Sequence, residues 1–115
     1  MTPSIYHNPR CSKSRQALAL LRERGFEPDI IEYLKQPPEK EQLRELIDLL
    51  GIRPRALLRS GETEYRQLGL ANPELDDDAL LQAMCEHPRL IERPIVIHRR
   101  QARIGRPPET ILEIL

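Results

Sequence analysis

The sequence predicts an α/β fold in which a mixed four-stranded sheet is built from a β-α-β unit, a helical insert and a closing β-β-α unit. Three observations lead to this prediction. A β-α-β pattern opens the chain, helical periodicity dominates its middle, and two strand patterns joined by a tight reversal precede a last helix. With 115 residues, 39% of them hydrophobic and 31% charged, the composition is globular, and we expect residues 1–115 to form one domain.

The N-terminal unit places a cysteine at the start of a helix. We expect a strand at Ser4 to His7, a helix from about Ser12 to Arg24 and a second strand at Pro28 to Tyr33. A helix of about 12 residues between two strands favours a parallel pair. Gly25 suits the position after the helix, and Cys11 falls at the helix N-terminus.

The helical insert is predicted from apolar periodicity and from capping signals. In its first helix, apolar residues recur at i, i+3, i+4 and i+7 before Gly51. Three aspartates at 76–78 suit the N-terminus of its last helix. The expected elements are a helix around Leu43 to Leu50, a short helix from Pro54 to Arg59, a turn at Glu64 to Leu68 and a helix over Ala79 to Glu86.

The C-terminal unit is predicted from a short apolar run and a pair of turn residues. Arg99-Arg100 is expected to make a tight reversal, so the strands on either side are antiparallel. The expected elements are a strand at Ile95 to Ile97, a strand at Gln101 to Ile104 that ends at Gly105, and a closing helix from Pro107 whose Ile111, Leu112 and Leu115 pack inward. The complete order is that of thioredoxin-like proteins, with helices inserted between the two halves of the fold. Element order alone does not specify chemistry.

Charge and cysteine content limit the classes of function. The chain carries 18 basic and 18 acidic residues, so no overall field favours binding to nucleic acid or to a membrane surface. No apolar run approaches the roughly 18 residues needed to span a bilayer, and the N-terminus lacks a signal-peptide pattern. Two cysteines can form only one disulfide, whereas small secreted domains usually carry several. We therefore expect a cytoplasmic protein without nucleic-acid or membrane partners.

Cys11 is the candidate nucleophile. A helix N-terminus presents unpaired N–H groups and the positive end of the dipole, which stabilise a thiolate. Arg10 and Lys13 add positive charge beside it, and Ser12 and Ser14 offer hydroxyl donors to a bound anion or to the sulfur. The alternative is a buried, inert cysteine, but Cys11 follows a polar loop rather than lying on an apolar face.

The remaining thiol-loop residues leave two questions open. His7, at the end of the first strand, would either polarise the site or serve a structural role. Ser14 occupies the position of the second thiol in a Cys-x-x-Cys motif, so an external thiol must resolve any adduct on Cys11. Cys85 is interpreted as a packing or partly exposed residue of its helix.

Three arginines stand at element ends or in loops next to Pro or Gly: Arg59, Arg93 and Arg106. Such positions can converge on a pocket. A guanidinium binds tetrahedral oxyanions through a fixed fork of donors, and several together would hold a doubly charged anion. Taken singly, each is more often a solvated surface residue, so only the combination indicates an oxyanion site.

A set of ordered motifs covers nearly the whole chain. They are Ile5-Tyr6-His7-Asn8-Pro9-Arg10-Cys11-Ser12-Lys13-Ser14-Arg15 at the thiol loop, Arg55-Ala56-Leu57-Leu58-Arg59, Tyr65 to Leu70, Asp77-Asp78, His87-Pro88, Arg93-Pro94-Ile95-Val96 and Arg103-Ile104-Gly105-Arg106-Pro107. In this order and spacing they resemble the ArsC-type arsenate reductases that use glutathione and glutaredoxin.

The resemblance implies a thioredoxin-like enzyme that reduces arsenate to arsenite. Its cysteine, here Cys11, would attack arsenate to form a thiol-bound arsenic(V) ester, which glutathione attacks. Glutaredoxin then removes the mixed disulfide, and arsenite is released. The resemblance also implies oxyanion binding by Arg59, Arg93 and Arg106, with a supporting His7 that lowers the thiol pKa. Glutathione is a co-substrate in this scheme, and neither a bound cofactor nor a metal is expected.

The thiol loop departs from the best-established arsenate reductases, which carry Ala-Cys-Gly-Thr-Ser where this chain has Arg10-Cys11-Ser12-Lys13-Ser14. It is more similar to a short branch of the family, in which Arg10 and Lys13 would admit a different oxyanion or a glutathionylated partner. Arg93-Pro94 resembles the family's cis-proline loop. Two other functions stay open: a non-enzymatic regulator like Spx, which binds RNA polymerase, and a glutathione-dependent thiol transferase.

Overall fold

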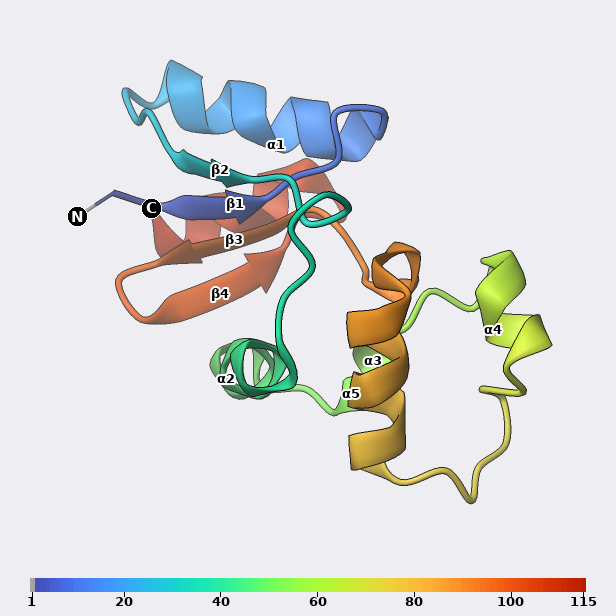
Figure 1. The fold of residues 1–115 in the computed structure, drawn as a ribbon. Helices are drawn as coiled ribbons and strands as arrows, with labels where there is room; N and C mark the ends of the chain where they lie inside the picture. The colour runs from blue at the N-terminus through green and yellow to red at the C-terminus, as the bar shows by residue number, and fades with distance from the viewer. Residues whose placement is uncertain (1) are drawn as a thin grey trace. The chain divides into compact units, whose positions relative to one another are not determined.

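The computed structural model of the protein describes residues 2–115, and its strands form one mixed sheet (Figure 1). These strands are β1 (Ser4–Tyr6), β2 (Asp29–Ile31), β3 (Ile95–His98) and β4 (Gln101–Ile104). They lie in the order β2-β1-β3-β4. Strand β1 is parallel to β2 and antiparallel to β3, and β3 is antiparallel to β4. The predicted α/β fold with a mixed four-stranded sheet is confirmed.

Contacts between residues divide the chain into two units. The sheet unit contains the described residues up to 36 together with 93–115, and the helical unit contains residues 37–92. The helical unit consists of α2 (Lys40–Leu50), α3 (Pro54–Leu57), α4 (Thr63–Gln67), α5 (Asp77–Glu86) and the 3-10 helix η1 (Pro88–Leu90). The expectation of a single domain over residues 1–115 stays a prediction. No helix in the described part of the chain is long and apolar enough to cross a membrane.

Helix α1 (Ser12–Glu23) connects β1 to β2 and ends in a Schellman motif. The Gly25 N–H donates to the Arg22 carbonyl at 3.0 Å, and the Phe26 N–H donates to the Leu21 carbonyl at 3.0 Å. Gly25 has a φ of 86°, a conformation that is costly for a residue with a Cβ. This turn confirms Gly25 as the residue that follows the helix.

The core of the sheet unit is aliphatic. One cluster of buried side chains joins β1, β3, α1 and the closing helix η2 (Pro108–Ile114): Ile5, Ala17, Leu21, Val96, Ile111 and Ile114. Each fully buried Leu, Ile or Val contributes about 1.5–3 kcal/mol to folding. Because α1 and η2 share this cluster with side chains of β1 and β3, both helices cover the same face of the sheet.

The closing element η2 is a 3-10 helix, which changes the side chains that face the core. Three residues per turn place positions i and i+3 on one face. Ile111 and Ile114 are therefore both buried, at 0% and 3% exposure, whereas Leu112 is only half-buried. The prediction is right for Ile111 and for the partly buried Leu115, which packs against the same core, and wrong in choosing Leu112 rather than Ile114.

Two other connections differ in how closely they follow the prediction. The Arg99-Arg100 reversal is confirmed, with φ values of 53° and 62° that match a two-residue hairpin turn. The helix expected from Pro54 to Arg59 instead ends at Leu57. It stops there because Leu58 forms an isolated antiparallel bridge with Ile91, which draws the backbone into an extended conformation.

The helical unit follows its capping signals. Gly51 ends α2 with a φ of 68°, and the Asp76 carboxylate accepts the Ala79 N–H at 2.9 Å at the start of α5. Asp78 connects α2 to α5 by ion pairs with Lys40 at 3.2 Å and Arg44 at 2.7 Å. The predicted helices of the insert are therefore confirmed, apart from the early end of α3.

Candidate active site

Cys11 occupies the N-cap position of α1, at the end of the loop that follows β1. Its backbone N–H donates to the Asn8 carbonyl at 3.0 Å, and its carbonyl accepts the Arg15 N–H at 3.0 Å. Its side chain makes no capping hydrogen bond, but the first-turn N–H groups of Lys13 and Ser14 act on the sulfur at this end of the helix, where the dipole favours negative charge. The predicted position of Cys11 at the helix N-terminus is confirmed.

Two of the predicted arginines lie at this thiol. Arg106 Nη2 is 3.7 Å from Cys11 Sγ, and the Arg93 guanidinium donates a hydrogen bond to the same sulfur. Arg106 Nε also donates to the Arg93 carbonyl at 2.8 Å. Arg93 precedes β3 and Arg106 follows β4, and because these strands are antiparallel neighbours, the start of one meets the end of the other. Both arginines precede a cis proline, as the resemblance implies for Arg93-Pro94.

The surroundings of Cys11 favour its thiolate. Burial raises the pKa of the thiol, but the backbone N–H groups of Ser14 and Lys13 and the charged guanidinium of Arg93 lower it, and the net effect is a pKa below the ordinary value. Lys13 thus acts through its backbone. The positive charge comes from Arg93, which is distant in the sequence.

His7 contacts the helix rather than the sulfur. Its Nδ1 lies 2.6 Å from the Ser14 hydroxyl, which also accepts the Asn8 N–H at 3.0 Å. Burial lowers the pKa of His7, with a smaller opposing effect from the Glu32 carboxylate, so the imidazole is neutral at neutral pH. The expected effect of His7 on the thiol pKa stays a prediction. Ser14 connects the two residues, because its hydroxyl contacts His7 and its backbone N–H lowers the pKa of Cys11.

Arg59 belongs to the helical unit. Its Nε lies 3.3 Å from a Glu62 carboxylate oxygen, and its Nη1 lies 2.8 Å from Glu92 Oε1. Its backbone N–H donates to the Leu90 carbonyl at 2.8 Å, which fixes it next to the segment that leads into Arg93. Its guanidinium is therefore held by two carboxylates, and oxyanion binding by Arg59 stays a prediction.

The chain that carries this thiol loop and these two arginines matches a known protein family over nearly its whole length. The ArsC family model matches residues 6–114. The chain belongs to the ArsC family. It is 52% identical to the uncharacterized protein YfgD of Escherichia coli K12 over 112 residues, which cover 96% of this chain and 94% of that protein.

Other ArsC-family relatives are named as enzymes. The chain is 48% identical to an arsenate reductase of Neisseria meningitidis, with 96% of each protein covered. The solved structure of an arsenate reductase from Vibrio cholerae is 53% identical and superposes with a TM-score of 0.98, covering 100% of this chain and 98% of that one. This likeness confirms the predicted thioredoxin-like architecture.

The second thiol of this ArsC-family chain has a pKa shift opposite to that of Cys11. Cys85 lies on α5 in the helical unit, where it is half-buried. Burial raises the pKa of its thiol, and the Glu86 and Glu39 carboxylates raise it further, against an opposing effect of Lys40. The net effect is a pKa above the ordinary value of a thiol. The packing interpretation of this residue is strengthened.

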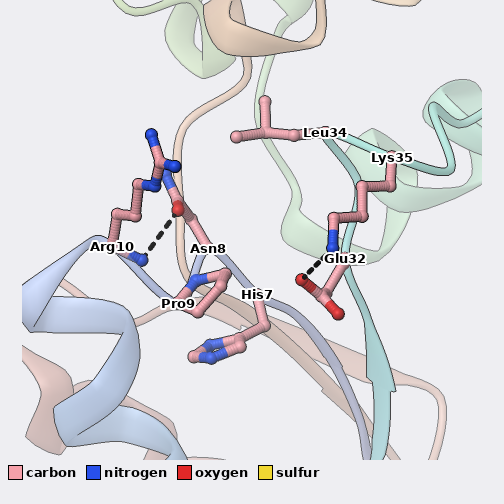
Figure 2. Close-up of a pocket in the computed structure, with 7 residues that line it drawn as sticks. All are labelled: His7, Asn8, Pro9, Arg10, Glu32, Leu34 and Lys35. Carbon is pink, nitrogen blue, oxygen red and sulfur yellow. Dashed lines mark hydrogen bonds and ion pairs between the residues drawn. The ribbon is translucent and has the colours of Figure 1, made fainter.

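A cavity of about 230 Å³ adjoins the thiol loop, and no pattern in the sequence indicates it because its walls come from two separate segments. Figure 2 shows the loop that precedes Cys11 on one side and the segment after β2 on the other. We call it the thiol-loop cavity; it is lined by His7, Asn8, Pro9, Arg10, Glu32, Leu34 and Lys35. Among residues 2–115, no group of three or more His, Cys, Asp or Glu side chains is placed to hold a metal ion.

Proposed function

We propose that this protein reduces arsenate to arsenite through a thiol-bound arsenic intermediate on Cys11, with glutathione and glutaredoxin as its reducing system. The observation that carries this proposal is the pairing of a thiol of lowered pKa with two guanidinium groups, Arg106 at 3.7 Å and Arg93 in a hydrogen bond. The names of the relatives and of the similar solved structure support arsenate as the substrate.

The first step uses the residues at the thiol. Arg93 and Arg106 offer planar donor forks to two oxygens of the oxyanion, which places arsenic in front of the sulfur. The Cys11 thiolate attacks arsenic, a sulfur–arsenic bond forms, and one arsenic–oxygen bond breaks. That oxygen leaves as water after protonation. The guanidinium groups and the N-terminus of α1 stabilise the negative charge throughout.

The later steps need two external thiols because Ser14 stands where a resolving cysteine would lie. The glutathione thiol displaces a second oxygen, which leaves as water, and binds arsenic. A glutaredoxin thiolate then attacks the glutathione sulfur, and the electron pair of the broken sulfur–arsenic bond reduces arsenic from the +5 to the +3 state. Two thiols become one mixed disulfide. Hydrolysis of the bond to Cys11 releases arsenite and restores the thiol.

A coupled assay tests the proposal directly. The protein is mixed with glutathione, glutaredoxin, glutathione reductase and NADPH, and arsenate is added last. We expect arsenate-dependent loss of NADPH absorbance well above the no-protein control. If arsenate causes no loss while a glutathionylated peptide does, the protein is a thiol transferase and not an arsenate reductase. Since the chemistry depends on reduced thiols, we also place the protein in the cytoplasm.

A further inference from the structure

The thiol-loop cavity carries charges that the chemistry at Cys11 does not use. The Arg10 guanidinium has no hydrogen-bond or ion-pair partner among residues 2–115; only its backbone N–H is engaged, donating to Asn8 Oδ1 at 3.0 Å. Lys35 Nζ lies 3.7 Å from Glu32 Oε1, and both side chains are exposed, so this pair is weak. With His7 neutral, two cations and one anion give the cavity a net charge of +1.

We infer that the thiol-loop cavity binds a terminal carboxylate of glutathione, an inference that rests on the proposed function. Glutathione carries two carboxylates at neutral pH. Arg10 presents a planar fork for one of them, and Lys35 supplies a second positive charge on the opposite wall (Figure 2). Pro9 and the exposed Leu34 provide apolar surface for the methylene groups beside the carboxylate.

Size and position fit one end of the tripeptide. A volume of about 230 Å³ lies below the range of about 300–1,000 Å³ that is typical of sites enclosing a whole drug-sized ligand. Cys11 is the residue after Arg10, and one extended peptide residue spans about 3.3–3.6 Å. The cavity wall formed by Arg10 therefore adjoins the residue that carries the reactive sulfur, and the proposal directs the cysteine of glutathione, one residue from its glycine carboxylate, toward Cys11.

Glu32 modulates the binding of anions in this cavity. Its carboxylate repels any anion that enters, a glutathione carboxylate included. Glu32 also competes with a ligand carboxylate for Lys35. This competition predicts an unusual sign: removing the negative charge of Glu32 strengthens glutathione binding, whereas removing either positive charge weakens it.

Calorimetric titration of the full chain with S-methylglutathione, whose blocked sulfur cannot react, tests the assignment. We expect Arg10→Gln and Lys35→Gln each to raise the dissociation constant about fivefold, and Glu32→Gln to lower it. Arg24→Gln is the matched control, because Arg24 is exposed at the far end of α1, about 20 Å along the helix axis from Cys11. Wild-type affinity in both Arg10→Gln and Lys35→Gln, or no binding to the wild type, overturns the assignment.

The experiments distinguish a wrong assignment of the cavity from a wrong proposed function. Binding of S-methylglutathione that depends on Arg10 and Lys35, without arsenate-dependent NADPH oxidation, supports the cavity and rejects the function. Arsenate turnover in which both variants keep the wild-type KM for glutathione rejects the cavity and supports the function. Alkylation of Cys11 at equal rates in wild type and variants shows that the thiol itself is unchanged.

Discussion

At the residue scale, the Cys11 sulfur lies 3.7 Å from Arg106 Nη2, and the Arg93 guanidinium and the backbone N–H groups of Lys13 and Ser14 lower the pKa of its thiol. Arg10 and Lys13, its charged sequence neighbours, contribute less directly: Lys13 acts through its N–H, and Arg10 lines the thiol-loop cavity. The reactivity of the thiol therefore depends on residues more than 80 positions away in the sequence as well as on the helix that Cys11 begins.

The first prediction concerns the ionisation of Cys11. We expect its alkylation rate to rise with pH to a plateau whose midpoint lies below the value of about 8.5 for a free thiol. Arg93→Gln should move the midpoint upward, because it removes a donor and a positive charge from the sulfur. Iodoacetamide modification followed by mass spectrometry measures this. A Cys11 profile like that of free cysteine would refute the proposed activation.

The second prediction separates geometry from charge at the two arginines. Arg93→Lys and Arg106→Lys keep the positive charge but lose the planar fork, so each should lower kcat/KM for arsenate about tenfold or more. Arg106→Lys also loses the Nε bond to the Arg93 carbonyl. Circular dichroism should show an unchanged fold. Full catalytic efficiency in a folded variant would mean that its arginine does not bind oxyanion through two donors.

At the element scale, hydrogen bonds of the Ser14 side chain with His7 and with the Asn8 N–H connect the loop after β1 to α1. A second connection joins the residues that follow β4 to those that precede β3. Gly105 N–H donates to the Pro94 carbonyl at 2.8 Å, and a Cβ at Gly105 would lie 2.8 Å from Pro94 Cγ. These two attachments set the positions of the sulfur and of the guanidinium groups.

The third prediction follows from the lowered pKa of His7. A histidine whose pKa is lower in the folded state contributes stability that is fully present above its unfolded pKa of about 6.5 and is lost as the pH falls through the folded pKa. Urea unfolding of wild type and His7→Gln between pH 7.5 and 5 measures this. The stability advantage of the wild type should shrink as the pH falls, and a difference independent of pH would contradict the argument.

The fourth prediction tests the close approach at Gly105. Gly105→Ala forces a shift between β4 and Pro94, so it should cost about 1–3 kcal/mol of stability and also reduce turnover, because Arg106 follows directly. Gly61→Ala is the control, since nothing lies within 4 Å of its added Cβ. Thermal unfolding and the coupled assay report the two effects. Equal stability of the two variants would show that the contact relaxes freely.

At the scale of the whole molecule, the two thiols belong to different units and have opposite pKa shifts. Cys11, in the sheet unit, has a lowered pKa, and Cys85, in the helical unit, has a raised one. With Ser14 in place of a second loop thiol, the molecule has one activated nucleophile. A mechanism with an external resolving thiol follows from this division.

The fifth prediction tests that division. Cys11→Ser should abolish turnover, because a serine hydroxyl cannot supply a thiolate or form a sulfur–arsenic bond. Cys85→Ser should remain active and lose at most some packing stability on α5. Both variants are compared in the coupled assay, with intact-mass analysis after a single turnover. An internal disulfide, or loss of activity in folded Cys85→Ser, would show that the second thiol takes part.

Local patterns in the sequence determined most of the secondary structure and the nucleophile. The break after β1 and the apolar face of α1 place Cys11 at a helix N-terminus, and Gly25 and Gly51 end their helices at positive φ. These signals act over one or two turns of backbone, so they can be read without knowledge of long-range contacts. The antiparallel hairpin at Arg99-Arg100 is local in the same sense.

Only the tertiary structure decided which side chains meet. In the sequence, Arg59, Arg93 and Arg106 are equally good candidates for binding an oxyanion. Strand pairing brings Arg93 and Arg106 to the thiol, whereas Arg59 forms ion pairs with two carboxylates of the helical unit. No pattern in the sequence indicates that Lys35 lies across a cavity from the thiol loop, or that η2 is a 3-10 helix. Contacts between distant segments depend on how strands pair and helices pack, and no local pattern records that arrangement.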